Sequence, residues 1–317
     1  MQSRRSGLQH YLLLCLSMVL LGLATACTSL AAPSLKIWSV EEQRVVSFQA
    51  LMERAGASDV VLIGESHDNR HHHIVQNMIL RAATGPDRKP VLVMEQYDLA
   101  QQEQLDAIAG SAMPWAGKAD ALQALMNDGW DRVGYRPLLE TAAREMLPIV
   151  AANMSRQALK EISRQGFDVL GTKEVQRLGL IGQWTTRQQA ALDQEIFQGH
   201  CNALPPAAVK SLSKAQRLRD AVMADKILAY PARPVVAILG RGHVRTDLAV
   251  PWYLKRRAPD RSLLTINLDE QIEEASPPGG ADAAPEGRYD YVINTPRSAP
   301  AIDHCSAFKP SSATRLQ

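Results

Sequence analysis

The sequence predicts an α/β fold in which a mostly parallel central sheet is flanked by helices, with helical insertions over the carboxyl-end rim. Uninterrupted short apolar runs recur along the chain, as expected for strands that are buried on both faces. Stretches with helical spacing separate these runs, which is typical of a parallel sheet with crossover helices. The predicted strands cover residues 60–63, 91–94, 149–152, 235–239, 263–268 and 289–293.

Helices and two insertions account for the chain between the strands. The stretches 100–135 and 155–230 contain no strong strand pattern, and they are too long for structureless loops in a compact domain. We therefore expect both to be helical insertions. The other expected helices cover residues 40–52, 69–83, 138–146 and 248–257, and one at 214–228 lies within the second insertion.

The N-terminus has the pattern of an export signal. Two arginines precede an uncharged, Leu-rich run at 11–26, which is shorter than the roughly 20 apolar residues that span a membrane. Residues 23–27 read LATAC, and small residues before a cysteine resemble the lipobox of bacterial lipoproteins. This pattern predicts a signal peptide at 1–26 and lipidation of Cys27. The alternative is an ordinary signal peptide in which Cys27 is incidental.

The rest of the expected organisation follows from this anchor. We expect a lipid-anchored tether at 27–35, an α/β domain at 36–308 and a tail at 309–317. Thr28 and Ser29 do not include the Asp that favours inner-membrane retention in some bacteria. The expected location is therefore the outer membrane, with the domain facing the periplasm or the cell surface.

The charge balance excludes a broad nucleic-acid surface. Arg4 and Arg5 account for the net charge of +2, and without them 33 basic residues match 33 acidic residues. Proteins that bind nucleic acid carry a basic patch or stripe instead.

Two cysteines remain beyond the anchor. Cys201 and Cys305 follow Cys27 in the exported part of the chain, which meets an oxidising compartment. We expect a disulfide between them, with two unpaired buried thiols as the alternative.

Polar side chains stand where the predicted strands end. In an open parallel sheet all carboxyl ends lie along one rim, and ligands bind there. Residues far apart in sequence should therefore meet in one cleft. These polar residues are Glu65, Ser66, His67, Asp68, Glu95, Asn153, Arg156, Arg241 and His243.

Glu65, His67, Glu95 and His243 have the chemistry of a metal or acid–base site. Imidazole and carboxylate ligands suit a divalent metal such as Zn or Mn, which can activate water for hydrolysis. Without a metal, a His–Glu pair can serve as acid and base. The catalytic and metal-binding hypotheses thus rest on the same four residues.

A purely structural interpretation stays open for the same positions. Glu65, Ser66 or Asp68 would cap the helix that follows, and Glu95 would pair with Arg241.

Three further histidines follow at 71–73. His67 and His71 lie four residues apart and would share a helix face. The run is typical either of a metal-binding tract or of an exposed helix start.

Several motifs follow one another in a specific order and spacing. They are VVLIGESHD at 60–68, the strand at 91–95, Trp130 with YRP at 135–137, the stretch 147–156, RDAVMA at 219–224, GRGH at 240–243, and YDYV at 289–292 with the later Cys305. Together they resemble the ChaN family of haem-binding lipoproteins, and the resemblance covers roughly residues 36–308.

The resemblance implies haem binding, a place in bacterial iron uptake and a set of haem contacts. It implies an outer-membrane lipoprotein that holds haem through tyrosine, between two copies of the chain, and that works with a haem-uptake receptor or transporter. The resemblance does not identify the tyrosine; Tyr135 and Tyr97 are the candidates because each lies near the predicted rim, and Arg156 and Arg241 are the other expected haem contacts. The first helical insertion would supply an apolar wall for the porphyrin, with helix core as the alternative for its residues Met113, Trp115, Met126 and Trp130.

The wider superfamily points toward an enzyme as well. The chain resembles Tiki-type metalloproteases and erythromycin esterases in its two G-x-x-H motifs, at 64–67 and 240–243, with Glu95 between them. The alternative function is therefore a metal-dependent hydrolase, and a third is an interaction scaffold with a vestigial site.

Overall fold

The computed structural model describes residues 35–270, 288–298 and 305. The chain divides into two units, residues 1–34 and 35–317. The predicted signal peptide, Cys27 and the tail at 309–317 lie outside the described residues. Within the described part, no helix has the length and apolar character needed to cross a membrane.

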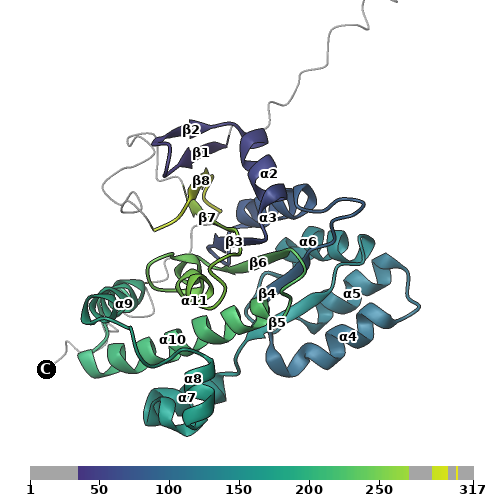
Figure 1. Ribbon diagram of the computed structural model, residues 1–317. Coiled ribbons are helices and arrows are strands. Elements are labelled where there is room, and N and C mark those ends of the chain that lie inside the picture. The colour runs from purple at the N-terminus through teal and green to yellow at the C-terminus, as the bar shows by residue number, and fades with distance from the viewer. Residues whose placement is uncertain (1–34, 271–287, 299–304, 306–317) are drawn as a thin grey trace, which may run out of the picture. The chain divides into compact units, whose positions relative to one another are not determined.

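The second unit is built on an eight-stranded sheet with the order β2-β1-β8-β7-β3-β6-β4-β5 (Figure 1). From β8 through β7, β3, β6 and β4 to β5 every neighbouring pair is parallel, whereas β1 pairs antiparallel with β8 and β2. This confirms the predicted mostly parallel sheet. The strands are β1 (Lys36–Ser39), β2 (Arg44–Val46), β3 (Val60–Glu65), β4 (Val91–Asp98), β5 (Ile149–Asn153), β6 (Val235–Gly240), β7 (Leu263–Glu270) and β8 (Tyr291–Thr295).

Helices cover both faces of the sheet. Alternate strand residues enter two separate cores: Val61 and Ile63 of β3 join one core, while Val60 and Leu62 join the other. The first core is closed by α2 (Phe48–Ala57), α3 (Arg70–Ala82), α4 (Gln102–Gly110), α5 (Trp115–Leu125) and α6 (Arg132–Arg144). The second face carries α7 (Arg156–Gln165), α8 (Thr172–Arg177), α10 (Pro206–Leu228) and α11 (Val250–Arg257), with α9 (Thr186–Gly199) against α10.

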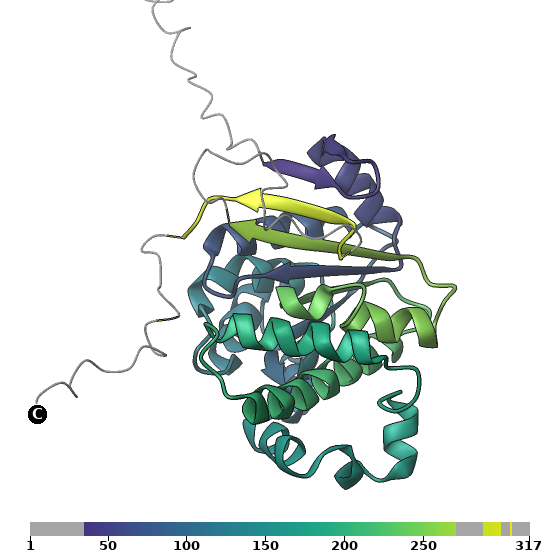
Figure 2. The same ribbon diagram turned by 90° about the vertical axis from the view of Figure 1, so that its left-hand side faces the viewer.

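The strand order creates a switch point beside β3. Strand β6 lies between β3 and β4. The chain from β3 to β4 and β5 runs toward one edge of the sheet, and the chain from β6 to β7 runs toward the opposite edge. In Figure 2 the yellow β8, the yellow-green β7 and the dark blue β3 lie side by side, as their pairing requires. Ligands of open α/β sheets bind outside the carboxyl ends at such a point.

The predicted helix at 40–52 is confirmed from Phe48 onward and wrong before it. The chain forms β1 and β2 first, and α2 begins only at Phe48, where the Ser47 side chain accepts a hydrogen bond from the backbone of Ala50. Strand β1 exists because it pairs with β8, a segment some 250 positions away. Local periodicity does not reveal such a distant partner.

Both predicted insertions are helical. Helix α10 begins at Pro206, earlier than the predicted start at 214, because Pro is well suited to the first helical turn. Its buried face packs on the sheet, and its polar side chains reach the rim.

The two cysteines predicted to pair are joined. Cys201, which follows α9, forms a disulfide with Cys305, and their Cα atoms lie 5.6 Å apart. This bond ties the C-terminal part of the chain to the second helical insertion.

Candidate functional site

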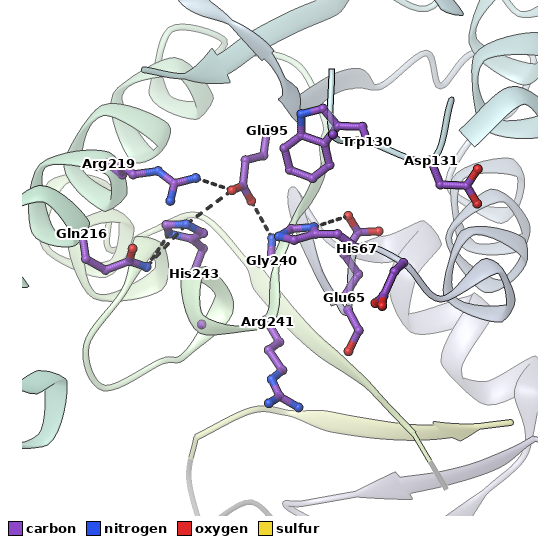
Figure 3. Close-up of a pocket in the computed structure, with 14 residues that line it drawn as sticks. Glu65, His67, Glu95, Trp130, Asp131, Gln216, Arg219, Gly240, Arg241 and His243 are labelled. Carbon is purple, nitrogen blue, oxygen red and sulfur yellow. Dashed lines mark hydrogen bonds and ion pairs between the residues drawn. The ribbon is translucent and has the colours of Figure 1, made fainter. Parts of the chain in front are cut away.

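A cleft of about 780 Å³ opens at the carboxyl ends of β3, β4 and β6 (Figure 3). Glu65 and Gly240 are paired in register at the ends of β3 and β6, and Glu95 follows the paired part of β4. The 3-10 turn η3 (Arg241–Val244), α10 and the start of α6 supply the remaining walls. The cleft is lined by Glu65, Ser66, His67, Asp68, Glu95, Gly129, Trp130, Asp131, Gln216, Arg219, Gly240, Arg241, Gly242 and His243.

Glu65 is a buried carboxylate surrounded by hydrogen-bond donors. The Gln76 and Gln96 amides donate to it at 2.5 and 2.9 Å, and the Tyr135 hydroxyl donates as well. The Nδ1 atom of His67 lies 2.9 Å from Oε1 of Glu65. Because the side chain is fully buried, these donors replace the water that a carboxylate needs.

The charged form of Glu65 is favoured by its neighbours. Burial alone raises the pKa of Glu65, but the hydrogen bond and charge of His67, followed by His73 and Tyr135, lower it below its usual value. Burial and the adjacent Glu65 raise the pKa of Tyr135 well above its usual value. Tyr135 is therefore held as a neutral donor to Glu65.

His67 is the exposed member of this group. Its side chain is 42% exposed, and its ring meets the edge of the Trp130 ring with the centroids 4.5 Å apart. Desolvation lowers the pKa of His67, but Glu65 and Glu95 together raise it above its usual value. The ring therefore stands in the cleft with its Nδ1 side fixed.

Glu95 has different partners. It forms an ion pair with Arg219 and accepts a 2.6 Å hydrogen bond from the backbone of Gly240, and Nε2 of His243 lies 3.6 Å from it. Burial raises the pKa of Glu95, but Arg219, then His243 and His67, lower it to about 2. A permanent negative charge beside a permanent positive one thus forms the floor of the cleft.

His243 is oriented by a second carboxylate. Its Nδ1 atom lies 2.6 Å from Asp220, and the Gln216 amide nitrogen lies 3.1 Å from the same ring atom. Burial raises the pKa of Asp220 to about 6, although His243 opposes this effect. The His243 side chain is only 5% exposed, so it closes the cleft rather than projecting into it.

The predicted catalytic and metal-binding residues meet in one cleft. Glu65, His67, Glu95 and His243 all line it. Across the described ranges no group of three or more His, Cys, Asp or Glu side chains is placed to hold a metal ion, so the structure adds no support for a bound metal.

The residues expected to contact haem have separate positions. Arg241 lines the cleft, whereas Tyr135 lies behind it on Glu65. Tyr97 is fully buried and donates to the carbonyl of Leu122 at 2.8 Å. Arg156 begins α7 after the edge strand β5 and does not line the cleft.

Several structural expectations at the rim are corrected. Asn69, not Glu65, Ser66 or Asp68, caps α3, since its side chain accepts from the backbone of His71. Glu95 pairs with Arg219 rather than with Arg241. The side chain of Asn153 accepts a hydrogen bond from the backbone N–H of Met154 and does not line the cleft.

The histidine run is mostly buried. His72 and His73 are at most 1% exposed, contrary to an exposed helix start. Nδ1 of His72 accepts from the backbone of Ser66 at 2.9 Å, and burial lowers the pKa of His72 to about 4. His73 packs on the Tyr135 ring, 3.9 Å between centroids, and its Nε2 lies 3.5 Å from Glu65.

Of the four apolar residues expected to form a porphyrin wall, Trp130 alone lines the cleft. Met126 is buried in the core, and Met113 and Trp115 are exposed elsewhere, with Arg144 over the Trp115 ring.

The sequence did not identify four residues that hold the site carboxylates and His243 in place. Two of them, Gln76 and Gln96, lie on predicted elements, but nothing in the sequence distinguishes a functional glutamine from any other. Arg219 and Asp220 stand in α10, where charged residues inside an otherwise buried helix face are the available signal.

Comparison with known proteins identifies similar chains. The profile of a family described as "Haem-binding uptake, Tiki superfamily, ChaN" matches residues 51–254. ChaN of Campylobacter jejuni, in a structure described as showing cofacial haem binding, is 20% identical, with a TM-score of 0.65 over 82% of this chain and 96% of its own. At that identity the likeness shows the fold.

Two weaker structural likenesses accompany it. A mutant of the erythromycin esterase EreC is 12% identical over 83% of each chain, with a TM-score of 0.44. A Bacillus cereus protein is 10% identical over 78% of this chain and 90% of its own, with a TM-score of 0.47. A search of curated proteins finds no match.

Proposed function

The chain belongs to the ChaN family of haem-binding uptake proteins, whose profile it matches over more than half its length, and we propose that it binds haem in the cleft at the ends of β3, β4 and β6. The family match over residues 51–254 is the observation on which this proposal rests. The cleft supports it, because a volume of about 780 Å³ is within the range of small-molecule and cofactor sites.

The chemistry of the lining residues fits haem in three respects. His67 presents an imidazole, which is an accepted iron ligand. Trp130 offers a flat apolar surface beside it. Arg241 is 62% exposed and lies 3.8 Å from Asp269, so its guanidinium is available to a propionate. Haem, when bound, would supply the iron centre, and these residues would hold and orient it.

The finer part of the proposal concerns the cellular role. We include export, lipidation at Cys27, an outer-membrane location and delivery of haem to a receptor or transporter. The LATAC sequence at 23–27 supports lipidation. The proposal also includes a second copy of the chain that covers the open side of the cleft.

A haemin titration followed by visible absorption tests the binding proposal. We expect a saturable Soret change that reaches its end point near one haem per chain. A weak change that never saturates would contradict haem binding.

Radiolabelled palmitate tests the anchor in bacterial cells. The wild-type protein should incorporate label and appear in the membrane fraction, and a Cys27→Ser variant should do neither. Equal labelling of both would contradict lipidation at Cys27.

A further inference from the structure

A second pocket lies at the other end of the parallel strands from the cleft. Its volume is about 220 Å³, and it is enclosed by α4, α5, the end of α6 and the start of β5, which Figure 1 labels. Pro148 and Ile149 in its lining lead into the amino end of β5, whereas the cleft lies at the carboxyl ends of β3, β4 and β6. The two cavities are therefore separate.

We propose that this pocket binds a small amphipathic anion, namely a carboxylate with an unbranched apolar chain, and that Lys118 binds the carboxylate at the mouth. This inference is independent of the proposed haem binding. It adds a second ligand of a different chemical class.

The wall of the pocket is apolar except at one point. The side chains of Leu105, Leu122, Leu147 and Ile149 are at most 6% exposed and form a continuous hydrophobic surface. Among the described residues that line the pocket, Lys118 is the only charged one. Small-molecule sites in proteins commonly combine a mostly apolar lining with a few placed polar groups.

The volume sets the length of the apolar chain. An engineered apolar cavity of about 150 Å³ stays dry and holds one benzene molecule. Scaled by volume, a cavity of 220 Å³ holds roughly nine carbon atoms. A porphyrin does not fit this space, so the pocket and the cleft would bind different ligands.

Exposed apolar side chains stand around the mouth. Met146, which lines the pocket, is 80% exposed, and its φ of 54° lies in the left-handed region that glycine or asparagine usually occupies. Trp115 is 40% exposed and lies one helical turn before Lys118 on α5. Neither Met146 nor Trp115 belongs to the two hydrophobic cores of the described chain. A bound apolar chain would therefore bury surface that the free protein leaves in water.

The charge at the mouth is positive. Nζ of Lys118 donates a 2.6 Å hydrogen bond to the carbonyl of Ala109, and an ammonium group has further N–H donors for a ligand. The guanidinium of Arg144 lies over the Trp115 ring, 4.2 Å from its centroid. The acid that precedes Met146, Glu145, is already paired with Lys89 at 2.6 Å. The mouth thus favours a negatively charged head group.

Lys118 also has a structural role that a test must separate from ligand binding. Ala109 is in the last turn of α4, where backbone carbonyls have no partner within the helix. The hydrogen bond from Lys118 supplies one. Loss of a helix cap would weaken every ligand of the pocket, whereas loss of a head-group contact would weaken anionic ligands alone.

Isothermal titration calorimetry with decanoate, below the concentration at which it forms micelles, tests the pocket. We expect saturable binding near one decanoate per chain, and binding at least tenfold weaker in Ala109→Phe, whose ring would fill the mouth. Ala107→Phe is the matched control, because Ala107 is exposed on the same helix and does not line the pocket. Equal losses of affinity in the two variants would overturn the proposal.

Lys118→Met tests the head-group contact. The affinity for decanoate should fall at least fivefold, and the affinity for 1-decanol, which has the same chain and no charge, should stay unchanged. An equal loss for both ligands would show that Lys118 only holds the end of α4, and would overturn its assignment to the carboxylate.

The outcomes are distinguishable from those for haem. Haemin titration of Ala109→Phe should match the wild type, and a protein that never saturates with decanoate would overturn the pocket proposal whatever haemin does. Cosedimentation of a Cys27→Ser chain with phosphatidylglycerol vesicles, without binding of free decanoate, would also overturn it. The exposed Met146 and Trp115 would then belong to a membrane-contact surface.

Discussion

Two buried carboxylates line this cleft from β3 and β4, the strands on either side of β6, and they are stabilised in different ways. Glu65 is surrounded by neutral donors, namely two amides and a phenol, together with the ring of His67. Glu95 is neutralised by the Arg219 guanidinium and a backbone N–H. The same residue type is thus used once as a hydrogen-bond acceptor for an exposed imidazole and once as half of an ion pair.

The difference indicates separate roles. A carboxylate with neutral donors keeps its negative charge for its imidazole partners, and of these His67, at 2.9 Å, lies closer to Glu65 than His73, at 3.5 Å. A carboxylate paired with arginine has its charge compensated, so Glu95 mainly fixes the geometry between β4, β6 and α10. In the proposed function, the Glu65 side is the binding side of the cleft and the Glu95 side is its structural floor.

Arg219→Met should have the largest effect on stability. The variant leaves the Glu95 carboxylate, which is 3% exposed, without its cation. We expect a loss of about 3 kcal/mol in the free energy of unfolding, because breaking a buried pair leaves an uncompensated charge. Chemical denaturation measures the loss.

Arg241→Met is the matched control for that variant. Arg241 is 62% exposed and loosely paired at 3.8 Å, so its removal should cost less than about 0.5 kcal/mol. Equal losses in the two variants would contradict the structural role given to the Glu95 ion pair.

Acid should remove the stabilisation that the same ion pair provides. The pKa of Glu95 is about 2 in the folded protein, below the usual 4.5. A lowered pKa means that the carboxylate stabilises the fold fully above pH 4.5, and that this contribution, about 3 kcal/mol, is lost as the pH falls toward 2.

Unfolding curves between pH 7 and 2 check this dependence. Glu95→Gln should be less stable at neutral pH and should lose less stability across the acid range than the wild type. Parallel pH profiles for the two proteins would show that Glu95 has an ordinary pKa.

Tyr135→Phe should have the smallest effect, and it sharpens the contrast between the two carboxylates. Removing one hydrogen bond should cost about 1 kcal/mol, and Tyr97→Phe, which loses a bond to a carbonyl, should cost a similar amount. Only Tyr135→Phe should raise the pKa of His67, because Glu65 then has one donor fewer and attracts the imidazole proton more strongly.

Nuclear magnetic resonance titration of the His67 ring protons in the haem-free protein measures that pKa. A shift of the same size in both variants would mean that Tyr135 does not act through Glu65.

The sequence was sufficient for the six parallel strands and for most residues at their rim, but not for β1 and β2. The buried strands are local apolar runs, and the end of each run locates the polar residue that follows, as with Glu65 and Glu95. Parallel strands then bring His67 and His243 into one cleft without further information. The edge strand β5 is the exception, and for that reason Arg156 lies outside the cleft.

The sequence did not predict which side chains from distant elements contact one another. Arg219 was not assigned to Glu95, because 124 positions separate them and only the packing of α10 brings them together. His72 and His73 were read as a polar run, yet the helix face they occupy is turned toward Tyr135 and Glu65. Helical spacing gives the face of a residue but not what covers that face.

Protection of His67 from diethyl pyrocarbonate tests most directly the claim that haem binds in this cleft. The modified peptide is quantified by mass spectrometry with and without saturating haemin, and His71, which does not line the cleft, serves as the internal reference. We predict that haemin slows modification of His67 at least tenfold and leaves His71 unchanged. Equal modification rates at His67 with haemin bound would contradict the assignment of this cleft as the haem site.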